Sequence, residues 1–460
     1  MSAIHEQAMH YIYQQVLERL LSHMSQAQRA SVQLLIQRLL VAAGGPEYIG
    51  TFRLLVLQGN DRRSAHLLAI LRAAQLSIAL RAPVTFQLRV LVVNLPTAGN
   101  AALDNHERSF NALFMQDDPR VQLQMTEGCE VVPFNRRPSA STERWALARN
   151  AMLMFGHGVD ARPEALLGSR LHLELAGAVG VALQAQSRAD VLITAVPARQ
   201  RRRYLAWARR SLCQAGERGP HLLHQCLATL ASGLGRLQGV AGSPLEPVGD
   251  PSRVVAEDAT LRVIAIDDLL PHLLEQEQLD LMLGCRLDPD QDAWPLAAFI
   301  DPMALAQLHE LRARCSEPMG HRQALRLAGP CAFDGQREPA SGHPGKAYGI
   351  SQTQLICLLF SPFARQGKGL ERFLQCRHPD MQVALPYLHR ALQGKPCPDA
   401  VKDWLVNTSG LALVQLRAIY EGRLQPASRR LMANLARRDV HLKLLPAPFV
   451  AGRPGLEGLP

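Results

Sequence analysis

The sequence predicts an α/β (or α+β) protein with a mixed sheet in its first half, flanked by helices, and a helix-rich second half. Short β-branched runs alternate with amphipathic stretches between residues 46 and 240, and helical spacing of apolar residues dominates beyond residue 257. The 460 residues are 47% hydrophobic and 20% charged, which is enough apolar material for a large core. This composition excludes a coiled-coil rod, a collagen, a low-complexity scaffold and a polytopic membrane protein.

The first unit, residues 1–45, is expected to be a helical hairpin. Apolar residues recur at helical spacing from residue 3 to residue 43, with a break near Ser25-Gln26. Gly44, Gly45 and Pro46 end the helical pattern.

The second unit, residues 46–240, is expected to be an α/β domain. Its strands are apolar, β-branched runs bounded by Gly, Pro, Asn or Asp, and its helices are amphipathic. A segment rich in Gly, Pro and Ser, residues 238–256, predicts the internal boundary. The expected strands are 52–57, 84–93, a hairpin of 121–125 with 131–134, and 191–196; the expected helices are 61–80, 141–155, 165–186 and 198–215.

The third unit, residues 257–445, is expected to be mainly helical, and residues 446–460 to form a disordered tail. A long loop is predicted at residues 327–349, where Gly and Pro are frequent. One strand is expected at 263–266, and helices at 268–283, 302–315, 351–361, 383–393 and 398–406.

Arginine dominates the charge of the chain. Lys and Arg number 50 against 40 Asp and Glu, giving a net charge of +10. The expected helix 198–215 concentrates this charge in Arg199, Arg201, Arg202 and Arg203. Guanidinium groups match phosphate oxygens in a bidentate manner, so these four residues are candidate phosphate ligands for inositol phosphates or anionic lipid. The alternative is an ordinary solvated helix face.

Nucleic acid is not the expected partner of this arginine-rich helix. Aromatic residues make up 5% of the chain, and none forms a stacking platform among the arginines. Single-stranded nucleic acid is bound by such platforms together with basic residues. A nucleic-acid-binding α/β protein therefore remains a third hypothesis, behind the two functions given below.

Cys331 and Arg337 have the C-x5-R spacing of the phosphate-binding loop of cysteine phosphatases. In such a loop, backbone N–H groups and the arginine surround the phosphate, and the same positive field favours the attacking thiolate. The alternative is a chance match, because nine cysteines in an arginine-rich chain give about one such spacing at random. The intervening Phe333 and Asp334 also suit an anion-binding loop poorly.

Neither a metal nor a cofactor is expected. The turn at Gly59 lacks the glycines of a dinucleotide- or nucleotide-binding loop. The His221, His224 and Cys226 group has no partner cluster, and Asp267-Asp268 is expected to cap a helix rather than to bind a metal. The nine cysteines contain no CxxC pair, which indicates a reducing compartment, and Met1 to Tyr13 lacks the pattern of a Sec signal peptide.

Three segments, read in order, resemble the type III-secreted inositol-phosphate phosphatases of the SopB/IpgD kind. The first is residues 82–100, a strand ending in Leu-Pro-Thr-Ala-Gly-Asn and followed by Glu107 and Phe110. The second is Val-Val-Pro-Phe-Asn at 131–135, which leads to an Ala- and Gly-containing helix. The third is Leu-Val-Asn-Thr-Ser-Gly-Leu-Ala-Leu-Val-Gln at 405–415. The family's catalytic signature, Cys-Lys-Ser-Gly-Lys-Asp-Arg-Thr, does not occur in the chain.

The resemblance implies a bacterial effector-like protein related to inositol-phosphate or phosphoinositide phosphatases, either active or catalytically degenerate. An active enzyme would be a cysteine-dependent phosphatase with Cys331 as nucleophile and Arg337 as phosphate clamp. It would be exported from the bacterial cytoplasm into a host cell without a Sec signal, and would meet a secretion chaperone and a host protein. The alternative is a non-catalytic interaction protein that binds a protein partner or an anionic phosphate ligand, with residues 3–43 as its docking hairpin.

Overall fold

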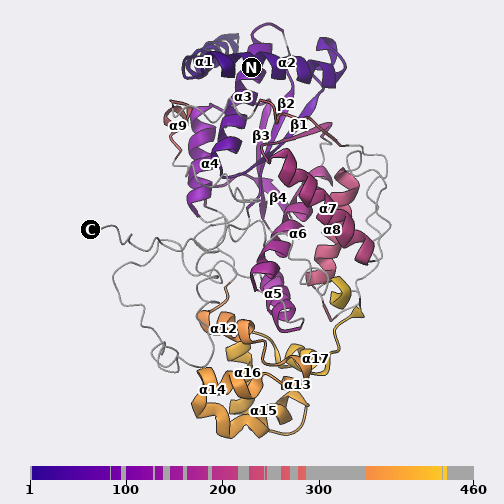
Figure 1. The fold of residues 1–460 in the computed structure, drawn as a ribbon. Coiled ribbons are helices and arrows are strands. Elements are labelled where there is room, and N and C mark those ends of the chain that lie inside the picture. Colours follow the sequence, from indigo (N-terminus) through magenta and orange to yellow (C-terminus); the bar gives the residue numbers. More distant parts are fainter. Residues whose placement is uncertain are drawn as a thin grey trace, which may run out of the picture.

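A computed structural model shows the fold of the chain (Figure 1). It describes residues 3–82, 84–94, 100–127, 130–137, 146–158, 163–184, 189–215, 227–242, 244–245, 261–269, 278–285, 349–426 and 428–431. Among these residues, no helix is long and apolar enough to cross a membrane.

Six strands form one mixed sheet in the order β4-β3-β2-β1-β5-β6, which confirms the predicted fold class. All neighbours are parallel except the β3–β4 hairpin, which is antiparallel as predicted. The order reverses at β1, so the sheet has the doubly wound arrangement with its switch point between β1 and β5. The strands are β1 (Arg53–Gln58), β2 (Gln87–Val92), β3 (Val121–Glu127), β4 (Glu130–Pro133), β5 (Val191–Thr194) and β6 (Arg262–Val263).

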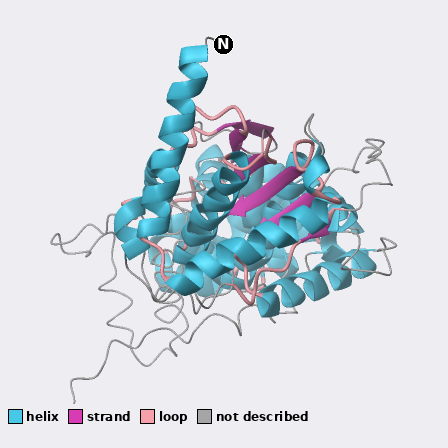
Figure 2. Ribbon diagram, turned by 90° about the horizontal axis from the view of Figure 1, so that it is seen from above, coloured by secondary structure: helices cyan, strands magenta, loops and turns pink. Residues whose placement is uncertain are grey.

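Helices lie on both sides of the strands (Figure 2). Because side chains alternate along a strand, β1 contributes Leu54 and Val56 to one core and Leu55 and Leu57 to another. The first core includes α3 (Arg62–Ala79), α4 (Asn100–Ala112) and α9 (Gln278–Leu283). The second includes α6 (Pro163–Gln184) and α8 (Leu227–Gly242). Burial on both faces explains why these strands are continuously apolar rather than alternating.

The predicted N-terminal hairpin is present as α1 (Ala3–Ser22) and α2 (Gln26–Ala43). Ser25 caps α2 in a capping box with Gln28, and Gly44 ends the helix in a left-handed conformation, with φ of 92°. The apolar face of the hairpin, including Leu20 and Leu35, joins the same core as α3 and β1. Residues 3–43 are thus built into the sheet domain.

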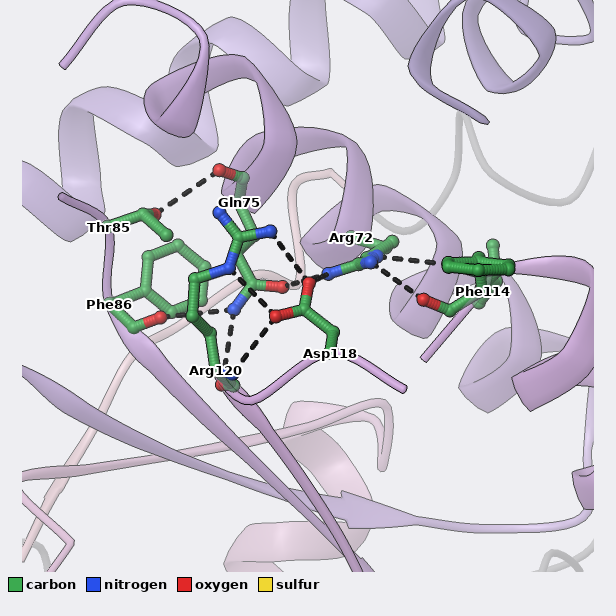
Figure 3. A network of polar contacts seen from close by, with 8 residues as sticks. Arg72, Gln75, Thr85, Phe86, Phe114, Asp118 and Arg120 are labelled. Atoms are coloured by element: carbon green, nitrogen blue, oxygen red, sulfur yellow. Dashed lines mark hydrogen bonds and ion pairs between the residues drawn. The ribbon is translucent and has the colours of Figure 1, made fainter. Parts of the chain in front are cut away.

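Asp118 and two arginines hold this part of the fold together near the amino ends of β2 and β3 (Figure 3). Arg72 of α3 is fully buried, and its Nη1 donates to Asp118 Oδ2 at 2.8 Å. Arg120 donates to the same carboxylate at 2.7 Å. Burial acts to raise the pKa of Asp118, but the hydrogen bonds from Arg120 and the charge of Arg72 lower it to about 2.

Further contacts extend this network to neighbouring elements. Arg72 donates to the carbonyl oxygens of Leu113 and Phe114, just after α4. Gln75, one turn along α3, donates to the Phe86 carbonyl at 3.0 Å, just before β2. The ring of Tyr13 in α1 stacks under Arg120, 4.3 Å from the guanidinium carbon. The network therefore joins α1 and α3 to the segments that precede β2 and β3.

Elements described beyond residue 349 are all helical, as predicted, and lie at the opposite end of the molecule from α1 and α2 (Figure 1). They join a third core shared with α5 (Ala146–Gly158) and α7 (Ala198–Ala215). The helices are α12 (Gln352–Phe360), α13 (Ala364–Gly367), α14 (Leu370–Arg377), α15 (Leu385–Leu392), α16 (Asp399–Ser409) and α17 (Leu413–Glu421). The 3₁₀ turn η8 (Pro379–Ala384) lies between α14 and α15, and a second 3₁₀ turn, η1 (Pro46–Tyr48), lies between α2 and β1.

α8, which the sequence patterns did not predict, ends at Gly242, inside the predicted boundary at 238–256. Earlier in this helix, glycine allows two helices to approach closely. A Cβ at Gly235 would lie 3.8 Å from the Cα of Gly177 in α6, so backbone faces backbone at this point. Of the expected helix 268–283, the described residues form a turn ending at 269 and α9, and residues 270–277 lie outside the described residues.

Replacing Asp118 by alanine should lower the free energy of unfolding by about 3–5 kcal/mol, because Arg72 would remain buried without its carboxylate. The wild-type contribution should be present above about pH 4 and be lost as the pH falls toward 2, because the folded pKa lies below the ordinary 3.8. Urea unfolding at several pH values measures both effects. Asp399→Ala, which removes the exposed pair with Lys402, is the control and should leave the midpoint unchanged; equal effects of the two variants would contradict the assignment.

Candidate functional site

The carboxyl edge of the sheet, beside the switch point, is the candidate site. β1 ends at Gln58 and leads through residues 59–61 to α3, and β5 ends at Thr194 and leads through residues 195–197 to α7. In open α/β sheets, ligands bind in the crevice outside the carboxyl ends of the strands, at the position where strand order reverses. The N-termini of α3 and α7 flank this position.

Both helices carry arginines in the first turn, where negative charge is preferred, and α3 is capped by Asp61, which accepts from the Ser64 backbone N–H. The first turn of α3 contains Arg62 and Arg63, that of α7 contains Arg199 and Arg201, and neither turn contains an acidic residue. The helix dipole places partial positive charge at the N-terminus and disfavours cations there. These arginines thus reinforce a positive potential and favour an anion at this edge.

Carboxylates from other elements balance part of this charge. Asp267, after β6, accepts a hydrogen bond from the Ala198 backbone N–H at 2.8 Å and one from Arg201 Nη2 at 2.6 Å. Its neighbour Asp268 forms an ion pair with Arg38 of α2. Asp267 is therefore a helix cap, but for α7 rather than for the helix expected to follow it. The two adjacent aspartates join α7 and α2 at this edge.

A second carboxylate serves the α3 side. Asp280 of α9 pairs with Arg62 at 2.7 Å and with the buried ring of His66 at 2.6 Å. Beside it, Asn105 of α4 donates to Asn60 at 3.3 Å. These residues were not identified from the sequence, because Asp280 lies more than two hundred positions from its partners and no motif marks it.

The outer face of α7 carries arginines that these carboxylates leave unbalanced. Arg199, Arg202, Arg209 and Arg210 are exposed and share one helix face, while Trp207 is buried on the other. Arg203 is half-buried. The helix contains no acidic residue, and among the described residues only Asp267 forms an ion pair with it, through Arg201.

Of the four arginines predicted as phosphate ligands, Arg199 and Arg202 are exposed and Arg203 is half-buried, and none of the three has a described acidic partner. The fourth, Arg201, forms an ion pair with Asp267. Cys331 and Arg337 lie outside the described residues, as do His221, His224 and Cys226. The described residues contain no group of three or more His, Cys, Asp or Glu that could hold a metal ion.

Two cysteines within the described ranges have environments that favour the neutral thiol. Burial raises the pKa of Cys357 well above its ordinary value. Burial also raises the pKa of Cys285, although its Sγ lies 3.0 Å from Ser109 Oγ. At Cys285 the charge of Arg108 acts in the opposite direction, but burial outweighs it, so neither position favours the nucleophilic thiolate.

No family model, curated protein or solved structure matches the chain.

Replacing Asp267 by alanine should lower the free energy of unfolding by about 1–2 kcal/mol, because α7 loses its cap. Thermal unfolding monitored by circular dichroism measures this loss. Asp267→Asn is the informative companion, since a neutral side-chain oxygen can still accept from the Ala198 N–H and should restore part of the stability. A midpoint unchanged in Asp267→Ala would show that the carboxylate does not cap α7 in solution.

Proposed function

We propose that the chain binds a phosphate-bearing ligand, an inositol phosphate or the headgroup of an anionic lipid, at the exposed arginine face of α7. Four exposed arginines on one face of α7 support this proposal. The helix contains no acidic residue, and among the described residues only Asp267 forms an ion pair with it. Guanidinium forks donate two parallel hydrogen bonds to phosphate oxygens, which supports phosphate over other anions.

The shape of this face supports a ligand with several phosphates. Arg199 and Arg210 are separated by about 16 Å along the axis, at 1.5 Å per residue. The arginines lie on a helix whose opposite face is anchored by Trp207 and Leu212 in a buried core. Anchoring keeps the helix backbone in a fixed position, so no backbone entropy is lost when a ligand binds.

Binding by this face fits two roles, an effector-like phosphatase or a degenerate relative that retains only binding. The catalytic role rests on the C-x5-R spacing of Cys331 and Arg337 and on the resemblance to inositol-phosphate phosphatases. In that role, Cys331 attacks phosphorus and Arg337 clamps the phosphate. Export through a type III system, with a secretion chaperone and a host protein as partners, belongs to the same proposal.

The binding proposal predicts that Arg199→Glu/Arg202→Glu weakens the affinity for inositol hexakisphosphate tenfold or more, about 1.4 kcal/mol or above, because two phosphate contacts become repulsive. Isothermal titration calorimetry measures this change, and the wild-type affinity should fall with added salt. The matched control is Arg372→Glu/Arg390→Glu, which makes the same charge change on exposed positions of α14 and α15. Equal weakening in both variants would reduce the effect to net charge and contradict the α7 site.

The catalytic role predicts that wild-type protein releases phosphate from an inositol phosphate or phosphoinositide and that Cys331→Ser does not. A panel of both substrate classes, read by free phosphate, gives the answer. Cys285→Ser is the control, because that thiol is neutral and held beside Ser109, and it should retain release. Release that survives in Cys331→Ser would exclude this cysteine as nucleophile, and no release by wild type would leave the binding role alone.

A further inference from the structure

A buried histidine lies where the first half of the chain meets the C-terminal helices. α5 occupies the junction between the two in Figure 1, and its residues share one core with α12 and α17. His157, near the end of α5, is 0% exposed, and neither ring nitrogen has a hydrogen-bond partner. Its ring lies 5.2 Å from that of Phe363, which follows α12.

Close contacts surround this histidine on both sides. Leu358 of α12 packs so closely on Gly156 that a Cβ there would overlap its side chain. Ser361, in a left-handed conformation with φ of 43°, donates from its hydroxyl to the Gly156 carbonyl at 2.7 Å. One turn earlier on α5, Leu153 lies against Gly410 at the end of α16. The C-terminal helices therefore pack against consecutive turns of α5 and enclose His157.

Among the described residues, no hydrogen-bond acceptor is available to hold a proton on this ring. The pKa of His157 is lowered to about 3 by burial alone. α8, which also packs on α5, contains no acidic residue. The titratable residues of α6 are Glu164, Arg170, His172 and Glu174, and α8 contains Arg236. α12 contains Cys357, α13 Arg365, α16 Asp399, Lys402 and Asp403, and α17 Arg417, Tyr420 and Glu421, with Arg149 on α5 itself.

We propose that this contact is an acid-sensitive joint: protonation of His157 favours separation of the C-terminal helices from α5. A buried imidazolium without a hydrogen-bond acceptor is costly, and opening the joint returns the ring to water. The proposed joint uses no residue of the phosphate-binding face, although α5 and α7 share one core.

The direction of the effect follows from linkage. Because the ring titrates near 6.5 when exposed and far lower when enclosed, docking is fully favoured above pH 6.5 and weakens as the pH falls toward 3. The docking constant should drop tenfold per pH unit, which is about 30-fold at pH 5. His378 also has a pKa lowered by burial, but it packs against Phe373 and Trp404 within the C-terminal helices and therefore affects their own stability.

Hydrogen–deuterium exchange of the full chain at pH 7 and pH 5, corrected for the intrinsic pH effect, tests the joint. Wild type should lose about 30-fold protection in peptides from α5 and α12, with helix content retained by circular dichroism. Peptides from α4 are read separately, because burial also lowers the pKa of His106 to about 4. His157→Phe keeps the aromatic ring without a titratable nitrogen and should change less than threefold. His10→Phe, at an exposed position on α1, should behave as wild type.

Protection that does not depend on pH in wild type, or an equal loss in His157→Phe, would overturn the proposal. If His157→Phe does not fold, titration of the His157 ring by NMR in wild-type protein decides instead. A midpoint near 6.5 would overturn the enclosed contact, and a ring that stays neutral at pH 5 in the docked state would support it.

Discussion

The fold depends on one buried charge and the acceptors that surround it. Arg72 has no exposed surface, so its guanidinium must find all its partners inside the protein, and the Asp118 carboxylate is the strongest of them. That requirement fixes where α3 crosses the strands, because Arg72 also donates to the Leu113 and Phe114 carbonyls just after α4. Its remaining acceptor, Gln75, in turn donates to the Phe86 carbonyl just before β2. Tyr13 extends the same constraint to the N-terminal hairpin through its ring.

The two ends of the sheet differ in how their arginines are paired with carboxylates. At the amino edge, the buried Asp118 pairs with the buried Arg72 and the partly exposed Arg120. At the carboxyl edge, Asp267 and Asp280 bind Arg201 and Arg62, yet the outer face of α7 keeps its arginines toward solvent. Like charges at helical spacing destabilise a helix, so α7 relies on its buried face, with Trp207 and Leu212, to remain folded. An arginine face whose mutual repulsion destabilises its own helix is suited to an anionic partner.

Local patterns predicted most elements, because strands and amphipathic helices are visible over short windows. The hairpin break at Ser25 and the extent of α7 follow directly from capping and periodicity. Long-range features could not be predicted in this way. The cap of α7 comes from Asp267, and the partners of Asp280 lie at Arg62 and His66. The close approach of α8 to α6 at Gly235 and Gly177 is likewise a long-range feature. Cys331 and Arg337 remain predictions from spacing.

The central claim is that phosphate binds the outer face of α7, and chemical footprinting of arginine tests it most directly. Phenylglyoxal modification followed by mass spectrometry reports each arginine separately, with and without saturating inositol hexakisphosphate. The account predicts that the ligand protects Arg199 and Arg202 and leaves Arg372 and Arg390, which are equally open to solvent, reactive as before. Protection shared evenly by all four residues, or confined to the C-terminal helices, would contradict it.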